Sequence, residues 1–468
     1  YCFTVDAGYN AQFKTKAYAN SYVAYCQNEY RDSLGGIVWG TNRIMVKMKP
    51  ACSISTLVQN MNILNLQYES KWYDSTIFAL VLPKDSNLFA FSNRIFESGM
   101  VKYAQPAFFH YVSLDGYDSN PEFENQWNLK DTTEILGDQW GPTTYKYGIN
   151  AIRAWSFTSG NPDIRIAVLD DGVLGNHEDL VDNVIAEKIF TNDSLSYMIN
   201  ARKHGTKCMG IISSSNNNKG LVGVAHTCKV VSLITMYYLA NVDTLCYNDE
   251  KMADAICYAC DSMNVSIFSC SWKINNVMTE IYLSAIDYAI QNGRHGKGCV
   301  IVFCSGNRRS GSQTEEVSSN ASLSNVLSVG GTTEHGYRVS LTPFWNDPDP
   351  SWESCYGDSL DLMAPGYGIS TTCYSSNDCY TSFEGTSAAA PHVAGVAALV
   401  LSIDSTLTHR EVFEILCSTA TKVHHGEENG YVYASNPAYP YGAWNNEMGY
   451  GLVNAHHAIL KTLYRDYY

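Results

Sequence analysis

Four polar residues in this 468-residue chain are of the types that together can cleave an acyl bond. Asp170 ends the apolar stretch IRIAVLD, His204 begins HGTKCMG, and Ser387 lies within EGTSAAAPHVAG. A buried carboxylate can orient an imidazole, the imidazole can accept a serine proton, and the serine can then attack a carbonyl carbon. Asn307, which follows CVIVFCSG, offers an N–H donor for the oxyanion that forms. Taken singly, each has an ordinary interpretation as a turn or helix cap, so the prediction depends on their meeting in space.

The segments around these residues predict an α/β fold with a mainly parallel sheet and helices on both of its faces. Apolar strand-like stretches alternate with helical ones, as in sheets that are covered on both sides. The expected strands are 164–170, 229–237, 265–271, 299–306, 325–331 and 360–366, and the expected helices are 204–214, 251–263, 279–293 and 388–403. Functional groups in such folds gather at the carboxyl ends of the strands. Asp170 and Asn307 follow two of these ends, while His204 and Ser387 begin helices.

Ser387 is followed by three alanines and then by Pro391. Because proline has no N–H, the carbonyl of Ser387 is expected to lack its usual helical partner. Thr386 or Ser387 is expected to be the N-cap of the long apolar helix. The small neighbours leave room for other groups to approach the hydroxyl, and the start of a helix favours negative charge there.

The N-terminal part of the chain predicts a separate small α+β unit. Its expected strands are 43–49, 76–83 and 101–109, and its expected helices are 55–64 and 87–98. The polar segment 111–123, which contains glycine and proline, predicts a linker. The pattern of residues 1–41 predicts no element.

The composition argues against several classes of protein. A formal net charge of −15 with no basic run argues against a nucleic-acid partner or binding to an anionic membrane. The apolar run 393–403 is too short to span a bilayer, so no transmembrane segment is expected. The first ten residues lack the basic and apolar regions of a signal peptide, which fits a chain from which one has been removed.

Fifteen cysteines are many for a cytosolic enzyme. Cys373 and Cys379 flank the polar segment YSSND and are predicted to close a small disulfide hairpin ahead of the serine. The CYAC motif at 257–260 has no second pair to complete a zinc site, so we interpret it as core packing. Cys208 lies one helical turn after His204 and is interpreted as a small buried side chain.

Five motifs, in this order along the chain, resemble those of the subtilisin-like serine proteases, or subtilases: AVLDDG, HGTKCMG with GLVGVA, FCSGN, LDLMAPG and EGTSAAAPHVAG. The resemblance covers roughly residues 125–460. It implies that Asp170 is the orienting acid, His204 the general base, Ser387 the nucleophile and Asn307 the oxyanion donor. It also implies polypeptide substrates and no catalytic cofactor.

The resemblance further implies a proenzyme. Residues 42–113 resemble the ferredoxin-like propeptide of the family, which assists folding and acts as an intramolecular inhibitor. Residues 114–130 would be a linker that contains the processing site, residues 131–468 the catalytic domain, and residues 1–41 an N-terminal extension. A permanent accessory domain at 42–113 is the alternative. The expected location is secreted or at the cell surface.

A structural calcium site is implied at positions that bind calcium in similar subtilases. Asp179, the side chain of Asn217 and loop carbonyls would supply the oxygen ligands that a hard cation prefers. The expected ligands are Asp179, Ser215, Asn217, Lys219 and Leu221. A plain solvated asparagine turn is the alternative.

The residues implied to bind substrate are Ser271, Trp272, Lys273, Ser305 and Gly306. The motifs DDG, SCSW and HGTKC resemble the kexin-like branch, which cleaves after paired basic residues. The acidic residues that line its first specificity pocket are missing here, and Lys273 replaces a glycine along which the substrate strand lies. The cleavage preference therefore stays open.

Three functions follow as hypotheses. The first is an extracytoplasmic serine endopeptidase, and the second is a subtilase-fold binding module whose cleft is impaired. The third, a thiol-redox or zinc protein built on the cysteines, would require metal or reversible changes of activity under reductant.

Overall fold

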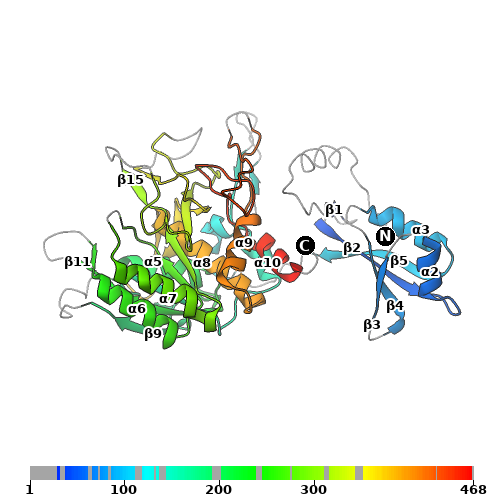
Figure 1. Ribbon diagram of the computed structural model, residues 1–468, viewed down its shortest axis with the longest axis horizontal. Helices are drawn as coiled ribbons and strands as arrows, with labels where there is room; N and C mark the ends of the chain where they lie inside the picture. The colour runs from blue at the N-terminus through cyan, green and yellow to red at the C-terminus, as the bar shows by residue number, and fades with distance from the viewer. Residues whose placement is uncertain are drawn as a thin grey trace. The chain divides into compact units, whose positions relative to one another are not determined.

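The computed structural model forms two compact units, Tyr1–Ser113 and Leu114–Tyr468, and each is described by itself (Figure 1). The residues that the structure describes are 29–31, 37–61, 66–71, 74–82, 86–110, 119–130, 133–135, 144–191, 202–238, 245–274, 277–309, 316–342, 351–427 and 430–465. Residues 111–118, in the predicted linker, lie outside this set.

In its described residues, the first unit is an antiparallel sheet with two helices. Its strands follow the order β1-β2-β4-β3, and β5 pairs with the other side of β2. The elements are β1 (Glu29–Arg31), β2 (Ile37–Met48), α2 (Ile54–Met61), β3 (Gln67–Lys71), β4 (Asp74–Val81), α3 (Leu88–Glu97) and β5 (Val101–His110). Strand β2 crosses the boundary that the sequence placed after residue 41, and β3 was not predicted. Side chains such as Ile44, Leu57 and Ile95 form the core.

The second unit is built on a seven-stranded sheet in which every neighbouring pair of strands is parallel. In sheet order the strands are β18 (Leu362–Pro365), β16 (Leu327–Thr332), β14 (Val300–Cys304), β13 (Ile267–Cys270), β8 (Arg165–Asp170), β10 (Lys229–Ile234) and β9 (Val184–Ile189). The predicted α/β class with a mainly parallel sheet is confirmed.

Helices cover both faces of this sheet. They are α5 (Lys203–Ser213), α6 (Asp249–Asp261), α7 (Glu280–Gly296) and α8 (Thr386–Ile403). Alternate residues of β8 face opposite sides, as in any strand. Ile166 and Val168 belong to the core cluster that contains α8, and Ala167 and Leu169 to the one that contains α6 and α7. Figure 1 shows α6 and α7 side by side.

Smaller elements complete the second unit. Helices α4 (Ala151–Trp155), α9 (His409–Ser418) and α10 (Ala455–Leu463) were not predicted. Neither were the antiparallel strand pairs β6 (Thr133–Ile135) with β7 (Thr144–Lys146), β15 (Asn307–Arg309) with β17 (Trp352–Ser354), and β19 (Ile369–Thr372) with β20 (Tyr380–Phe383). Two short 3₁₀ helices, Phe123–Asn125 and Trp127–Leu129, precede them.

The stretch 229–237, expected as one strand, is divided at Thr235. Strand β10 ends before this residue, and β11 (Met236–Tyr238) pairs with β12 (Leu245–Tyr247) in a separate hairpin. The backbone N–H of Thr235 donates to the carbonyl oxygen of Asp170 at 3.1 Å. The chain therefore leaves the sheet directly beside Asp170.

Helix α8 is the most apolar of the helices that the structure describes. It is 18 residues long with a mean hydropathy of 1.6, so by length and composition it could cross a membrane, and 83% of it is buried inside the unit. It packs against α5 and against β13, β14, β16 and β18. These contacts are those of a central core helix.

Candidate active site

The three central strands of the large sheet end where the candidate residues lie. Asp170 is the last residue of β8, Ser271 follows β13, and Asn307 follows β14 after two further residues. Because these strands are parallel, their carboxyl ends meet at one edge of the sheet. Helices α5 and α8 start with the residues around His204 and Ser387.

His204 and Asp170 form a direct pair. The Nδ1 atom of His204 lies 2.8 Å and 3.0 Å from the two carboxylate oxygens of Asp170. The Asp170 side chain is 2% exposed and the His204 side chain 27%, so the imidazole reaches the surface from a buried support. Burial alone would lower the pKa of His204, but the adjoining carboxylate outweighs it and holds this pKa well above its usual value. A proton taken up by the imidazole is therefore stabilised.

Helix α8 begins at Thr386, and its N-cap is Gly385, with no side-chain cap bond. The prediction that Thr386 or Ser387 is the N-cap is wrong, because both hydroxyls are engaged by other loops. Gly385 has a φ of +117°, and a Cβ there would lie 2.9 Å from Nδ2 of Asn307. Only glycine brings the chain past Asn307 in this conformation.

Ser387 and Ser271 bond to each other in both directions. The hydroxyl of Ser387 donates to the carbonyl oxygen of Ser271 at 2.9 Å, and the hydroxyl of Ser271 donates to the carbonyl oxygen of Ser387 at 3.0 Å. The latter carbonyl also accepts a weak bond from Sγ of Cys208 at 3.7 Å. Side chains from other segments thus occupy the carbonyl that Pro391 leaves without a helical partner.

The side-chain amide of Asn307 is fixed by Thr386. Its Oδ1 accepts hydrogen bonds from the backbone N–H and from the hydroxyl of Thr386, both at 2.9 Å. No described residue accepts a hydrogen bond from its Nδ2, so both N–H groups remain for a ligand beside Ser387. The sequence predicted Thr386 only as a possible N-cap and not as the residue that fixes Asn307, and its place directly before the serine is the only signal in the sequence.

Two further neighbours of His204 were missed or given a minor role. Phe383 presents its ring to the imidazole edge-on, with the ring centroids 5.4 Å apart. Cys208 places Sγ 3.7 Å from Nδ1 of His204, and burial raises the pKa of its thiol. Cys208 is fully buried, as the sequence predicts.

Two of the five residues implied to bind substrate direct their side chains into the protein. Nε1 of Trp272 donates to the carbonyl oxygen of Leu169, and the hydroxyl of Ser305 donates to that of Cys355, each at 2.9 Å. Both residues are buried. Only their backbone atoms are left for a substrate, because the indole and the hydroxyl already hold the strand ends together.

The other three lie around Ser387. Ser271 bonds to it directly, as described, and the exposed Lys273 donates from Nζ to the carbonyl oxygen of Asn307 at 3.1 Å. Gly306 donates its backbone N–H to the hydroxyl of Thr386 at 3.2 Å. The lysine side chain therefore connects the segments after β13 and β14.

The five residues implied to bind calcium come together around Asp179. Oδ2 of this buried carboxylate accepts from the backbone N–H of Leu221 at 2.8 Å, and Oδ1 has no hydrogen-bond partner among the described residues. Burial raises the pKa of Asp179. Within the part of the chain that the structure describes, the carbonyl oxygens of Ser215, Lys219 and Leu221 accept no hydrogen bond.

Asn217 completes this loop. Its Nδ2 donates to the carbonyl oxygen of Glu178, and its Oδ1 accepts from the backbone N–H of Lys219, both at 3.0 Å. These bonds fix the amide oxygen without occupying all of its acceptor capacity. An unpaired buried carboxylate oxygen, free carbonyls and an anchored amide oxygen are a donor set that fits a hard cation.

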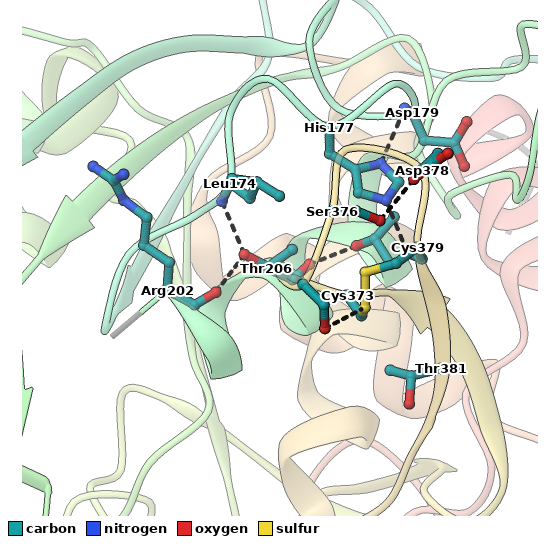
Figure 2. The surroundings of a disulfide bond; sticks show 12 residues. Leu174, His177, Asp179, Arg202, Thr206, Cys373, Ser376, Asp378, Cys379 and Thr381 are labelled. Atoms are coloured by element: carbon teal, nitrogen blue, oxygen red, sulfur yellow. Dashed lines mark hydrogen bonds between the residues drawn. A yellow bond between two sulfur atoms is a disulfide. The ribbon is translucent and has the colours of Figure 1, made fainter. Parts of the chain in front are cut away.

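The predicted disulfide between Cys373 and Cys379 is present and closes the turn between β19 and β20 (Figure 2). The carbonyl oxygen of Cys379 lies 2.9 Å from Nε2 of His177, and Nδ1 of that ring accepts from the backbone N–H of Asp179 at 3.2 Å. The disulfide turn therefore supports the segment that carries Asp179.

Comparison with known proteins agrees with this arrangement. A model of the subtilase family matches residues 161–451, which is more than half of the chain. A thermophilic serine proteinase from Bacillus sp. (strain AK1) is 30% identical over 355 residues, which cover 74% of this chain and 76% of that protein. Subtilisin E from Bacillus subtilis is 29% identical over 292 residues, which cover 59% of this chain and 66% of that protein.

Two further similarities concern calcium and fold. A calcium-dependent protease from Nostoc sp. is 29% identical over 369 residues, which cover 72% of this chain and 51% of that protein, so the chain spans about half the length of this relative. Among solved structures, a protease from Pseudoalteromonas arctica matches with a TM-score of 0.53 and 23% identity, covering 74% of this chain and 99% of that one. The match to this solved structure shows that the two proteins have a similar fold.

Proposed function

Because this chain belongs to the subtilase family, we propose that it is a serine endopeptidase in which Asp170, His204 and Ser387 form the catalytic triad. The observation that carries the proposal is the contact of His204 Nδ1 with both oxygens of the buried Asp170 carboxylate. A structural role for this pair would not require the imidazole, which is carried by the first turn of α5, to reach the surface.

The proposed reaction starts with the serine hydroxyl turning from the carbonyl of Ser271 towards Nε2 of His204. Because Nδ1 keeps its proton and donates a hydrogen bond to Asp170, Nε2 is the basic nitrogen. It accepts the hydroxyl proton while Oγ of Ser387 bonds to the substrate carbonyl carbon. Nδ2 of Asn307 donates to the resulting oxyanion.

The same imidazole then acts as an acid. It returns the proton from Nε2 to the leaving amine nitrogen as the peptide C–N bond breaks, which leaves an acyl group on Ser387. Water attacks this ester with His204 again as the base. The bond between the acyl carbon and Oγ of Ser387 then breaks, Nε2 of His204 returns the proton to Oγ, and the carboxylic acid product departs. Asp170 stays ionised throughout and stabilises the imidazolium in both steps.

Lys273 keeps a second candidate function open, that of a binding module with an impaired cleft. Its Cδ lies 3.3 Å from where a Cβ on Gly306 would be, and its Nζ bonds to Asn307, so the side chain crosses the strand ends beside Ser387. Digestion of casein by the wild type, together with labelling of Ser387 by a fluorophosphonate, separates the two functions. If Ser387 of the wild type is labelled but only the Lys273→Gly protein digests casein, the result favours the impaired binding module.

We further propose that the Asp179 loop binds a structural calcium ion. Asp179, Asn217 and the carbonyls of the loop would hold it, and the ion would neutralise the buried carboxylate. The name of the Nostoc relative, a calcium-dependent protease, supports the proposal.

Chelation is expected to lower the melting temperature of the Ser387→Ala protein, which cannot digest itself, by about 5 °C or more. Added calcium should restore it, because a ligand of the folded state stabilises that state. Differential scanning calorimetry measures both values. The melting temperature of an Asp179→Asn protein should not change with calcium. If the melting temperature of the protein with the unchanged loop also did not change, that result would contradict the site.

We also propose that the first unit is a propeptide and that the enzyme is extracytoplasmic. The order of the two units along the chain and the Cys373–Cys379 disulfide support this, since disulfides persist in oxidising compartments. The tail of such a propeptide would lie in the active site after folding and would be its first substrate.

Active protein is then expected to mature to a form that starts between residues 110 and 125, whereas the Ser387→Ala protein stays full length. Mass spectrometry of the purified chains identifies the new terminus. The isolated 1–120 fragment should inhibit the mature enzyme in trans, because a preorganised partner loses little entropy on binding. Efficient digestion by the intact chain, without inhibition by that fragment, would instead indicate a permanent accessory domain.

A further inference from the structure

Asp171 is a buried carboxylate directly beside the triad, and none of the proposed steps uses it. Its side chain is 0% exposed. Oδ2 accepts from the backbone N–H of Lys203 at 3.1 Å, and Oδ1 accepts from that of Gly205 at 2.9 Å. The backbone N–H of His204 lies 3.2 Å from both oxygens. One side chain thus accepts from three successive N–H groups in the first turn of α5.

The backbone of Asp171 is tied to the same place. Its N–H donates to Oδ1 of Asp170 at 2.8 Å, and its carbonyl oxygen accepts from the N–H of Arg202 at 3.2 Å. Asp171 is therefore bonded both to the carboxylate that contacts the imidazole and to the backbone that carries the imidazole. A Cβ on Gly205 would lie 3.1 Å from the Cβ of Asp170, which shows how closely the helix start approaches the strand end.

We propose that Asp171 is a positioning residue, which holds the first turn of α5 against the end of β8 so that His204 meets Asp170. The proposal rests on the proposed function of that pair. The first N–H groups of a helix have no partner within the helix, and the residue that precedes α5, Arg202, makes no side-chain cap bond. A carboxylate has two acceptor oxygens and a negative charge that the helix start favours. A serine or threonine hydroxyl, as at an ordinary cap, could not accept from all three groups.

The charges around Asp171 set its protonation state. Burial and the neighbouring Asp170 raise the pKa of Asp171 to about 6, while the bonds from Gly205 and His204 and the charge of His204 act in the opposite direction. Of the cationic side chains at this turn, Arg202 is paired with Glu187 at 2.6 Å, and Nζ of Lys203 lies 5.3 Å from the ring centroid of Tyr374. Protonation of Asp171 would place an O–H among N–H donors, so the turn is held well only when the carboxylate is ionised.

The test compares Asp171→Asn with Asp361→Asn. Asp361 is also a carboxylate that accepts a backbone N–H, from Ser328 at 2.9 Å, and burial raises its pKa to about 7, but it is partly exposed and directly precedes β18. Asparagine retains the shape at position 171 and loses the charge and part of the acceptor capacity. We expect kcat for a peptide substrate to fall about 10- to 100-fold with KM changed less than threefold, as for a misplaced general base. Asp361→Asn should keep both parameters.

Two readouts separate positioning from general stability. The acid limb of the kcat/KM profile should reflect two ionisations in the wild type and one in Asp171→Asn. Hydrogen exchange at residues 203–205, measured by mass spectrometry in the Ser387→Ala background, should accelerate only in Asp171→Asn. This second measurement does not need an active enzyme, so it also tests the proposal if the proposed function fails. Unchanged exchange at these amides, or a kcat within twofold of wild type, would overturn it.

Discussion

Replacement of Ser387 by alanine is expected to reduce kcat for peptide hydrolysis on the order of a millionfold, the magnitude of the same change in subtilisin. In the proposed mechanism His204 activates this hydroxyl, and alanine leaves nothing to form the acyl intermediate. The effect should fall on kcat, because substrate contacts made elsewhere persist. Initial rates with a chromogenic peptide, at protein concentrations fixed by absorbance, measure it.

A second serine on the same helix provides the control. Ser402 donates its hydroxyl to the carbonyl oxygen of Ala398 at 2.6 Å, within α8 and far along it from Ser387. Ser402→Ala should keep wild-type activity and fluorophosphonate labelling. If Ser387→Ala hydrolysed the peptide at a rate near wild type, the protease proposal would have to be abandoned.

The second large effect is expected from Asn307→Ala, which should lower kcat about 100- to 1,000-fold with little change in KM. The two bonds from Thr386 hold Oδ1 of the amide, so Nδ2 is already aimed before any substrate arrives. Such a donor stabilises the oxyanion more than the neutral carbonyl, and its loss therefore appears in kcat.

Asn307→Asp sharpens this test. Aspartate retains the acceptor that Thr386 requires, but it replaces the donor by a negative charge, so it should be at least as impaired as the alanine variant. Asn325→Ala, which removes a surface amide paired with Arg410, is the matched control and should be neutral. An Asn307→Asp enzyme with wild-type kcat would show that another group stabilises the oxyanion.

The central sheet could be predicted because its strands are continuous apolar stretches, and the candidate site because its four residues follow strand ends or begin helices. Strand β9 was missed because every one of its residues is at least partly exposed, which hides a strand pattern. The prediction of the N-cap of α8 was wrong for a different reason. Thr386 has the right type for a cap, but its hydroxyl is used by Asn307, a partner 79 residues away that no local pattern contains.

The role proposed for Asp171 could not be predicted for the same reason, because its partners are distant in the sequence. The sequence displays it as the second residue of a DDG turn, which is an ordinary turn composition. Its importance depends on three N–H groups that lie 32 to 34 residues later. In contrast, the Cys373–Cys379 disulfide and the carbonyl freed by Pro391 are consequences of local spacing, and both were anticipated from the sequence alone.

Helix α8 has a consequence for the order of events during synthesis and folding. The same 18 residues carry Ser387 and fill the middle of the core, so the nucleophile has no fixed position until the strands beneath it have assembled. Before that stage, the exposed apolar helix makes the chain prone to aggregate with other partly folded chains. Under the proposed function, a new molecule becomes proteolytic only after this core has formed, so unfinished molecules cannot yet digest one another.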